Sequence, residues 1–218
     1  MIKQSIILDI DETLVHTFSP DETEEFLKLE PFTNPLLFSI RNRVYNTILY
    51  DVGEPAGSGD RWNMYGIKRP YLNEFLTYCF KRFENVIIWS AGKKEYVDHL
   101  AGVMTDFLDE DAKFVLNFDH VRHGEEDYDK PIDFIKEFYQ DIKNVNLNNT
   151  FIVDDKSSNF HVPNPFNGIL IPAYNPTLTI NGLLQKDTML LKLMDFFKQP
   201  HVCSTSDIRK IDKQRIFA

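Results

Sequence analysis

Five short runs made mainly of apolar residues recur along the chain and predict buried strands. They lie at residues 6–10, 86–89, 114–118, 151–153 and 169–171. Unbroken runs of this length are typical of strands covered on both faces of a parallel sheet. Segments with helical spacing of apolar residues lie at 71–83, 94–108, 132–142 and 183–197. This alternation predicts an α/β fold, with a Rossmann-like parallel sheet sandwiched by helices.

The stretch from about residue 18 to residue 67 departs from this alternation. Three prolines, Pro20, Pro31 and Pro35, precede β-rich pieces at 36–40 and 44–50, and a turn-prone segment follows at 53–59. We interpret the stretch as a small antiparallel β insertion after the first strand. Because the sequence contains no repeat, low-complexity tract or linker, residues 1–218 are interpreted as a single domain carrying this insertion.

The amino-acid composition and the net charge exclude some classes of protein and some classes of binding partner. Hydrophobic residues make up 43% of the chain and charged residues 26%, values that are ordinary for globular proteins and unlike those of disordered or collagen-like chains. The 33 Asp and Glu residues outnumber the 24 Lys and Arg residues, which gives a net charge of −9. General binders of nucleic acid or of anionic membranes are usually basic. We therefore expect a monomer without a direct nucleic-acid or membrane partner.

Cysteine usage and the first residues indicate the compartment. The two cysteines, Cys79 and Cys203, cannot form a disulfide framework and do not have the spacing of a zinc site. The first apolar run stops at Asp9, before a signal-peptide core or a membrane span is complete. A cytoplasmic or nuclear location is therefore expected, without secretion and without a membrane anchor.

Polar residues follow three of the predicted strands. Asp9 and Asp11 follow the first, Ser90 follows the second, and the pair Asp154 and Asp155 follows the fourth. Ligands of an open parallel sheet bind beyond the carboxyl ends of its strands, so we expect these side chains at one edge.

The carboxylates at this edge predict a metal site. Asp9 and Asp11 are two residues apart, so their side chains project the same way from extended chain and repel one another. Mg²⁺ offsets such repulsion with a few carboxylate or carbonyl ligands while keeping substrate phosphate in its remaining positions. Asp155 is the natural third protein ligand. A carboxylate of such a site can attack phosphorus and form an aspartyl-phosphate.

The DIDET sequence at residues 9–13 resembles the first motif of the haloacid dehalogenase superfamily. More narrowly, the chain resembles the phosphatases that act on the C-terminal domain of RNA polymerase II, especially their small soluble branch. Further matching segments lie at residues 68–70, 89–92, 128–130, 152–155 and 191–197. The resemblance implies Mg²⁺-dependent hydrolysis of phosphoserine and phosphothreonine in a protein or peptide, with the polymerase tail as a candidate substrate.

The resemblance also implies roles for individual residues. Asp9 would be the nucleophile, and Asp11 would be the general acid that protonates the leaving oxygen and then activates water. Ser90 and Lys130 would hold the phosphoryl group, and Thr13 would brace the loop.

The same resemblance implies a ligand set for Mg²⁺. Asp9, Asp155 and the backbone carbonyl of Asp11 would bind the ion, and Asp154 would act through a metal-bound water.

Substrate recognition is expected from the insertion and from basic residues. The resemblance implies an apolar pocket for a proline beside the phosphoserine, and Phe18 with apolar residues at 36–50 are candidates for it. Residues 90–92 read Ser-Ala-Gly where relatives commonly read Thr-Ala-Ser, and Lys93 and Lys94 follow them. The two lysines indicate an acidic or doubly phosphorylated peptide, because clustered cations attract further negative charge.

Other interpretations stay open at this point. The same fold also serves small phosphorylated metabolites or nucleic-acid 3′ ends, and a non-catalytic scaffold that binds a phosphopeptide is a third class. Cys203 and Arg209 have the spacing of thiol phosphatases. We interpret that spacing as chance, because no strand leads into the segment and Asp207 would repel phosphate.

Overall fold

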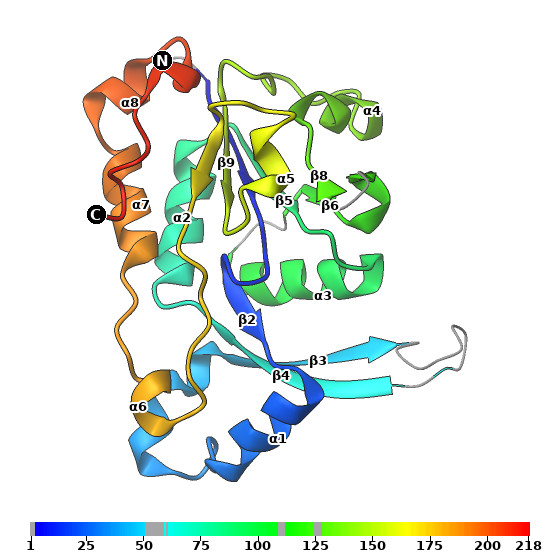
Figure 1. Ribbon diagram of the computed structural model, residues 1–218, viewed down its shortest axis with the longest axis vertical. Helices are drawn as coiled ribbons and strands as arrows, with labels where there is room; N and C mark the ends of the chain where they lie inside the picture. Colours follow the sequence, from blue (N-terminus) through cyan, green and yellow to red (C-terminus); the bar gives the residue numbers. More distant parts are fainter. Residues whose placement is uncertain (1–2, 51–58, 60, 109–111, 124–127) are drawn as a thin grey trace.

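The fold is built around a parallel sheet of five strands, seen in the computed structural model in Figure 1. The structure describes residues 3–50, 59, 61–108, 112–123 and 128–218. The spatial order is β10-β9-β1-β5-β6. The strands are β1 (Ser5–Leu8), β5 (Asn85–Trp89), β6 (Phe114–Leu116), β9 (Thr150–Asp154) and β10 (Gly168–Leu170). Their positions confirm the predicted parallel sheet and the five runs behind it.

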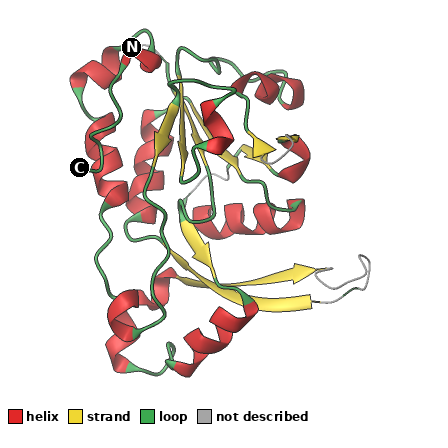
Figure 2. Cartoon of the chain, viewed as in Figure 1, coloured by secondary structure: helices red, strands yellow, loops and turns green. Residues whose placement is uncertain are grey.

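Helices cover both faces of this sheet, which explains the unbroken apolar runs (Figure 2). One face packs on α2 (Leu72–Arg82), α3 (Lys94–Thr105), α7 (Met189–Phe197) and α8 (Pro200–Ser204). The other face packs on η3 (Ile132–Phe134), α4 (Ile135–Phe138) and α5 (Ser158–His161). Neighbouring residues of β1 point to opposite faces, since Ile6 lies in the first apolar cluster and Ile7 in the second.

A second, antiparallel sheet forms the insertion, in the order β2-β4-β3. It consists of β2 (Val15–Thr17), β3 (Val44–Tyr50) and β4 (Arg61–Lys68), and β3 and β4 form the arm that projects in Figure 1. α1 (Pro20–Lys28), the 3₁₀ helix η1 (Pro35–Arg43) and α6 (Ile180–Leu183) pack around an apolar cluster of their own beside this sheet. We call the two sheets the parallel sheet and the insertion sheet. The insertion sheet begins at Val15, three residues before the predicted boundary.

Two predicted segments differ from the structure, and a third lies almost wholly outside the described residues. Residues 36–40 lie in η1 rather than in a strand, because Asn34 caps that helix and Pro35 occupies its first position. Residues 132–142 give only η3 and α4, and the chain leaves helical geometry at Tyr139. The turn predicted at 53–59 lies, except for Gly59, outside the described residues.

The last predicted helix is divided, because residues 184–188 do not belong to it. α6 ends at Leu183 and α7 begins at Met189. Between them, Asp187 accepts a hydrogen bond from the backbone N–H of Met189 and pairs with Arg69.

A short two-stranded sheet of β7 (Arg122–His123) and β8 (Tyr128–Asp129) precedes Lys130. Within the described part of the chain, no helix is both long and apolar enough to span a bilayer.

Arg69 connects three parts of the chain from a buried position at the end of β4. Its guanidinium donates to both carboxylate oxygens of Asp187, at 3.1 and 2.9 Å, and to the backbone carbonyls of Thr13 and Pro172, at 3.0 and 2.8 Å. Two parallel hydrogen bonds to a carboxylate make a strong ion pair. Removal of one partner of a buried pair lowers stability, because the other charge is left without compensation.

Replacement of Arg69 by leucine is predicted to lower the free energy of unfolding by about 3 kcal/mol, because the Asp187 carboxylate and two carbonyls lose their donor. Denaturant-induced unfolding measures the change. Lys198→Met, which removes the exposed pair between Lys198 and Asp195, is the control and should change stability little. Equal effects of the two substitutions would contradict the role assigned to Arg69.

Candidate active site

The carboxyl ends of β1, β5 and β9 meet at one edge of the parallel sheet. Leu8 pairs with Ile88 of β5 and with Val153 of β9, so the residue after each strand end comes close to the others. The backbone N–H of Asp9 donates to the carbonyl of Val153 at 3.0 Å. The register therefore places Asp9 beside Asp154, as the sequence predicted.

Lys130 lies between two of these carboxylates. Its Nζ is 2.6 Å from Oδ1 of Asp9 and 2.7 Å from Oδ2 of Asp154. Lys130 and Asp154 are fully buried, and Asp9 is 7% exposed. The backbone of Lys130 is fixed by Asn159, whose carbonyl accepts its N–H at 2.8 Å, and by Asn164, whose side chain donates to its carbonyl at 2.7 Å. A buried cation thus joins Asp9, which follows β1, to Asp154 at the end of β9.

Burial and charge act in opposite directions on this group. Burial raises the pKa of Asp9 above its ordinary value, while the charge of Lys130 acts to lower it. Burial acts to lower the pKa of Lys130, but the charges of Asp9 and Asp154 outweigh this effect and raise it. Lys130 therefore keeps its proton and compensates the carboxylates beside it.

Asp154 has its remaining acceptor capacity filled by the chain. Its oxygens accept from the Asn159 side chain at 2.9 and 3.0 Å, and from the backbone N–H of Lys156 at 2.9 Å. Four donor contacts in total, two from Asn159 and one each from Lys130 and Lys156, hold this carboxylate in place. Such a carboxylate suits an outer position at a metal site better than direct ligation.

Asp155 is the more accessible acid of the pair, and Thr13 braces it. The backbone N–H of Asp155 donates to Oγ1 of Thr13 at 3.1 Å, and Thr13 Oγ1 lies 3.5 Å from Oδ1 of Asp155. Burial, followed by the charge of Asp154, raises the pKa of Asp155. The loop after β1 and the loop after β9 are therefore attached to each other at the site.

The donor set fits a hard divalent cation. Asp9, Asp154 and Asp155 each offer a carboxylate oxygen, and these oxygens lie within 4.8 Å of one another. Oxygen ligands at this spacing suit Mg²⁺. The positive charge of Lys130 compensates one of the three carboxylates. The other two would balance the two positive charges of one Mg²⁺ ion.

Asp11 lies on a tight loop across from this group. Glu12 adopts a left-handed conformation with a φ of 56°, and its N–H donates to the carbonyl of Val15 on β2 at 2.8 Å. Its carbonyl accepts from the N–H of Tyr174 at 2.6 Å. One oxygen of Asp11 accepts from the Tyr96 hydroxyl, and the other lies 3.4 Å from Oγ of Ser90. Burial raises the pKa of Asp11, and the Tyr96 hydrogen bond acts to lower it.

Ser90 is fixed at the end of β5. It is buried, its N–H donates to the carbonyl of Leu116 at 3.1 Å, and its Oγ accepts from the N–H of Gly92 at 3.1 Å. The hydroxyl thus lies at the edge where the sequence predicted it. The structure brings Ser90 together with Asp11, and Lys130 together with Asp9.

The prediction that Phe18 lines a substrate pocket is wrong for this structure. Its ring is fully buried against Phe26 and His16 in the apolar cluster of the insertion, so it offers no surface to a ligand. Leu37 and Ile40 of the predicted 36–50 segment are buried in the same cluster. Lys93 is exposed and is the N-cap residue of α3, two residues after Ala91.

Tyr96 and Asn159 belong to the site but were missed from the sequence. Each lies near the start of a helix that follows a strand end of the site. Polar residues in the first turns of such helices are the sequence signal that could have identified them. Cys203 does not form a thiol site, because its Sγ donates to the carbonyl of Phe197 and Arg209 pairs with Asp207.

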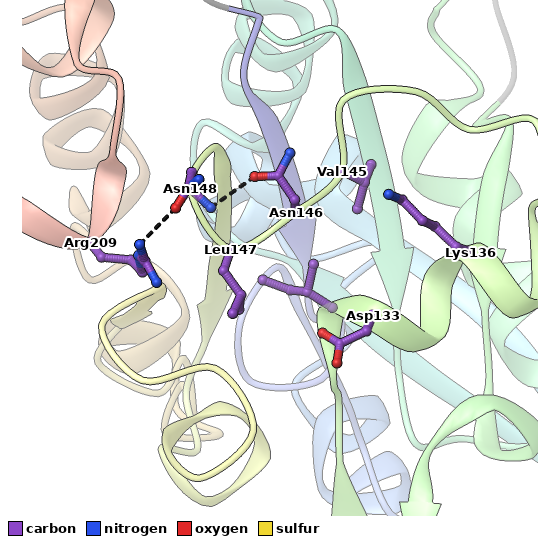
Figure 3. Close-up of a pocket in the computed structure, with 8 residues that line it drawn as sticks. Asp133, Lys136, Val145, Asn146, Leu147, Asn148 and Arg209 are labelled. Atoms are coloured by element: carbon purple, nitrogen blue, oxygen red, sulfur yellow. Dashed lines mark hydrogen bonds between the residues drawn. The ribbon is translucent and has the colours of Figure 1, made fainter.

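A pocket of about 450 Å³ lies away from these acids (Figure 3). In it, Arg209 donates to Oδ1 of Asn148 at 2.7 Å, and the backbone of Asn148 donates to Asn146 at 2.9 Å. None of its eight lining residues is a predicted site residue. This pocket is therefore separate from the acids at the ends of β1 and β9.

Replacement of Lys130 by methionine is predicted to lower the free energy of unfolding by about 3–5 kcal/mol, because two buried carboxylates lose their shared cation. Lys136→Met, which removes an exposed lysine six residues away, is the control. Chemical denaturation measures both. A Lys130 variant as stable as the parent would show that the carboxylates are not held by this charge.

Comparison with known proteins identifies the relatives of this chain. Residues 4–209 match the model of the NLI interacting factor-like phosphatase family. The ubiquitin-like domain-containing CTD phosphatase 1 of Drosophila melanogaster is 32% identical over 167 residues, which are 71% of this chain and 47% of that protein. The human protein of the same name is 31% identical over 147 residues, 61% of this chain and 42% of that protein. This chain thus spans about half the length of the curated relatives it matches.

Solved structures share the fold. A fission yeast structure described as RNA polymerase II CTD phosphatase Fcp1-R271A bound to beryllium fluoride gives a TM-score of 0.60 at 18% identity, over 90% of this chain and 52% of that one. A second Fcp1 structure gives a TM-score of 0.59 at 16% identity, over 97% of this chain and 59% of that one. The extent of the family match, from the first strand to the C-terminal segment, confirms the resemblance found in the motifs: the chain belongs to the NLI interacting factor-like phosphatase family.

Proposed function

We propose that this protein hydrolyses phosphoserine and phosphothreonine esters in proteins or peptides, through a phosphate bound covalently to Asp9. The observation that carries the proposal is the buried contact of Lys130 with Asp9 and Asp154, with Asp155 beside them. This arrangement prepares Asp9 as a nucleophile with a defined orientation. Its Oδ1 is bound by Lys130, so its other oxygen is the one to attack phosphorus.

In the first step, that oxygen of Asp9 forms a bond to phosphorus as the bond from phosphorus to the serine oxygen breaks. Asp11 donates its proton to the departing oxygen, and the raised pKa of its carboxyl favours the protonated form. Lys130 and Ser90 donate hydrogen bonds to phosphoryl oxygens in this proposal.

In the second step, Asp11 takes a proton from water, and the water oxygen attacks phosphorus. The bond from Asp9 to phosphorus then breaks and inorganic phosphate leaves. One residue thus acts first as acid and then as base, which returns the site to its starting state.

Mg²⁺ is the proposed cofactor. Asp9, Asp155 and the backbone carbonyl of Asp11 would hold it, with Asp154 in an outer position. Such an ion would neutralise negative charge on the phosphoryl group.

The proposed substrate is a phosphorylated protein, and the RNA polymerase II tail is the specific candidate. The support is that relatives carry the name CTD phosphatase. The net charge of −9 favours a peptide over a nucleic-acid end.

The activity is tested with a serine-proline phosphopeptide, free phosphoserine and a sugar phosphate, each with Mg²⁺ and with EDTA. We expect the peptide to give the highest kcat/KM and EDTA to abolish its hydrolysis. Asp9→Asn should lower kcat by about 10³-fold or more. The control Asp133→Asn removes an exposed acid outside the site and should retain activity. Hydrolysis that survives EDTA and is lost on thiol alkylation would contradict the proposal and favour Cys203.

Lys93 and Lys94 are proposed to select acidic or doubly phosphorylated peptides. Both are exposed at the start of α3, the helix that follows Ser90. Charge reversal of both to glutamate should raise KM for such peptides about tenfold without changing kcat, and added salt should reduce the difference. Lys136→Glu is the control. An unchanged KM would remove this role for the two lysines.

A further inference from the structure

A chain of three hydroxyl groups leads from the insertion sheet to Asp11. The hydroxyl of Tyr45 on β3 is 2.7 Å from Oγ1 of Thr17 on β2, and that oxygen is 2.6 Å from the hydroxyl of Tyr96 on α3. The hydroxyl of Tyr96 donates to Oδ1 of Asp11. A chain of hydrogen bonds through β3, β2 and α3 thus ends at one carboxylate oxygen of Asp11, the proposed general acid.

The direction of these hydrogen bonds follows from the number of protons. Each hydroxyl has a single proton to donate. Because Tyr96 gives its proton to Asp11, Tyr96 must accept from Thr17, and Thr17 must in turn accept from Tyr45. The chain therefore runs one way, from Tyr45 to Asp11. Burial raises the pKa of both tyrosines, so both hydroxyls keep the protons that the chain requires.

The packing of the insertion sheet fixes the far end of the chain. Gly66 on β4 pairs with both Tyr45 and Thr17. A Cβ at Gly66 would lie 2.3 Å from the Tyr45 hydroxyl and ring, so only glycine leaves room for the phenol. Tyr45 is 7% exposed. The end of the chain therefore has little freedom to move.

The chain distinguishes the two oxygens of Asp11. Oδ1 is occupied by Tyr96, whereas Oδ2 lies 3.4 Å from Ser90 Oγ, the proposed phosphate donor. A proton to be delivered to the leaving oxygen must be on the oxygen that faces the phosphate. With Oδ1 engaged, that oxygen is Oδ2.

We propose that Tyr96 is a positioning residue for Asp11, and that Thr17 and Tyr45 hold its hydroxyl in place. This inference rests on the proposed function, because it assigns Tyr96 a part in proton transfer by Asp11. It also gives the insertion sheet a part in catalysis besides any contact with substrate. Removal of the Tyr96 hydroxyl should leave binding intact and slow the steps in which Asp11 must present its proton.

The test compares Tyr96→Phe with the unmodified protein in single-turnover reactions with excess enzyme and Mg²⁺. One substrate is a phosphoserine peptide, whose leaving oxygen needs a proton, and the other is p-nitrophenyl phosphate, whose leaving group does not. For Tyr96→Phe we expect the release of the serine peptide to slow about tenfold or more, and the release of p-nitrophenolate to change less than about twofold. KM for the peptide should stay within about twofold.

Tyr139→Phe is the matched control. Its hydroxyl also makes two hydrogen bonds, to the backbone of Val115 at 2.9 and 3.2 Å, but outside the site. It should react with both substrates as the parent does. Equal slowing of both substrates by Tyr96→Phe, or no slowing, would overturn the inference.

Thr17 gives a second test that does not depend on the folding of Tyr96→Phe. Thr17→Val removes the middle hydroxyl and should slow release of the serine peptide, whereas Thr17→Ser restores a hydroxyl and should recover most of the rate. Equal rates for the two variants would overturn the inference. If the unmodified protein releases neither leaving group, the proposed function fails and this inference fails with it. If it releases both but Tyr96→Phe matches it, only the inference fails.

Discussion

The buried charge of Lys130 is the constraint on which the site depends. A parallel sheet with both faces covered has room for polar groups only beyond its strand ends, and this chain gathers three carboxylates there. The carboxylates of Asp9 and Asp154 are both buried and lie close together, so they repel one another. Lys130, at 2.6 and 2.7 Å from Asp9 and Asp154, supplies the compensating charge from a loop far along the sequence.

The rest of the architecture fixes groups around this charge. Thr13 attaches the loop after β1 to Asp155, Asn159 holds Asp154, and Arg69 binds the carbonyl of Thr13 from the insertion sheet. Each contact joins segments that are distant in sequence. The insertion is therefore part of the framework of the site, and the hydroxyl chain through Tyr96 extends that framework to Asp11.

The sequence predicted the parallel sheet and the residues at its edge because both depend on local patterns. A covered strand needs an unbroken apolar run, and the acids of β1 and β9 follow such runs directly. Long-range contacts carry no local signal. Asp187 divides the last helix because it binds Arg69, which lies 118 positions earlier, and the apolar run at 36–40 becomes helical because of a cap at Asn34.

Phe18 and Tyr96 show the same limit within the site. An aromatic residue after a motif can line a pocket or fill a core, and only packing against Phe26 decides that Phe18 fills the core. Tyr96 resembles any other residue of an amphipathic helix until the insertion sheet brings Thr17 beside it. Residue type and spacing predicted the acids, and tertiary structure determined what holds them.

The role of Asp9 as nucleophile is tested by locating phosphate on the protein during turnover. The reaction is quenched with the phosphoserine peptide bound, the acyl-phosphate is reduced with borohydride, and the modified peptide is identified by mass spectrometry. A single modification, at Asp9, is expected. Modification at another residue, or none while the substrate is being hydrolysed, would contradict this role.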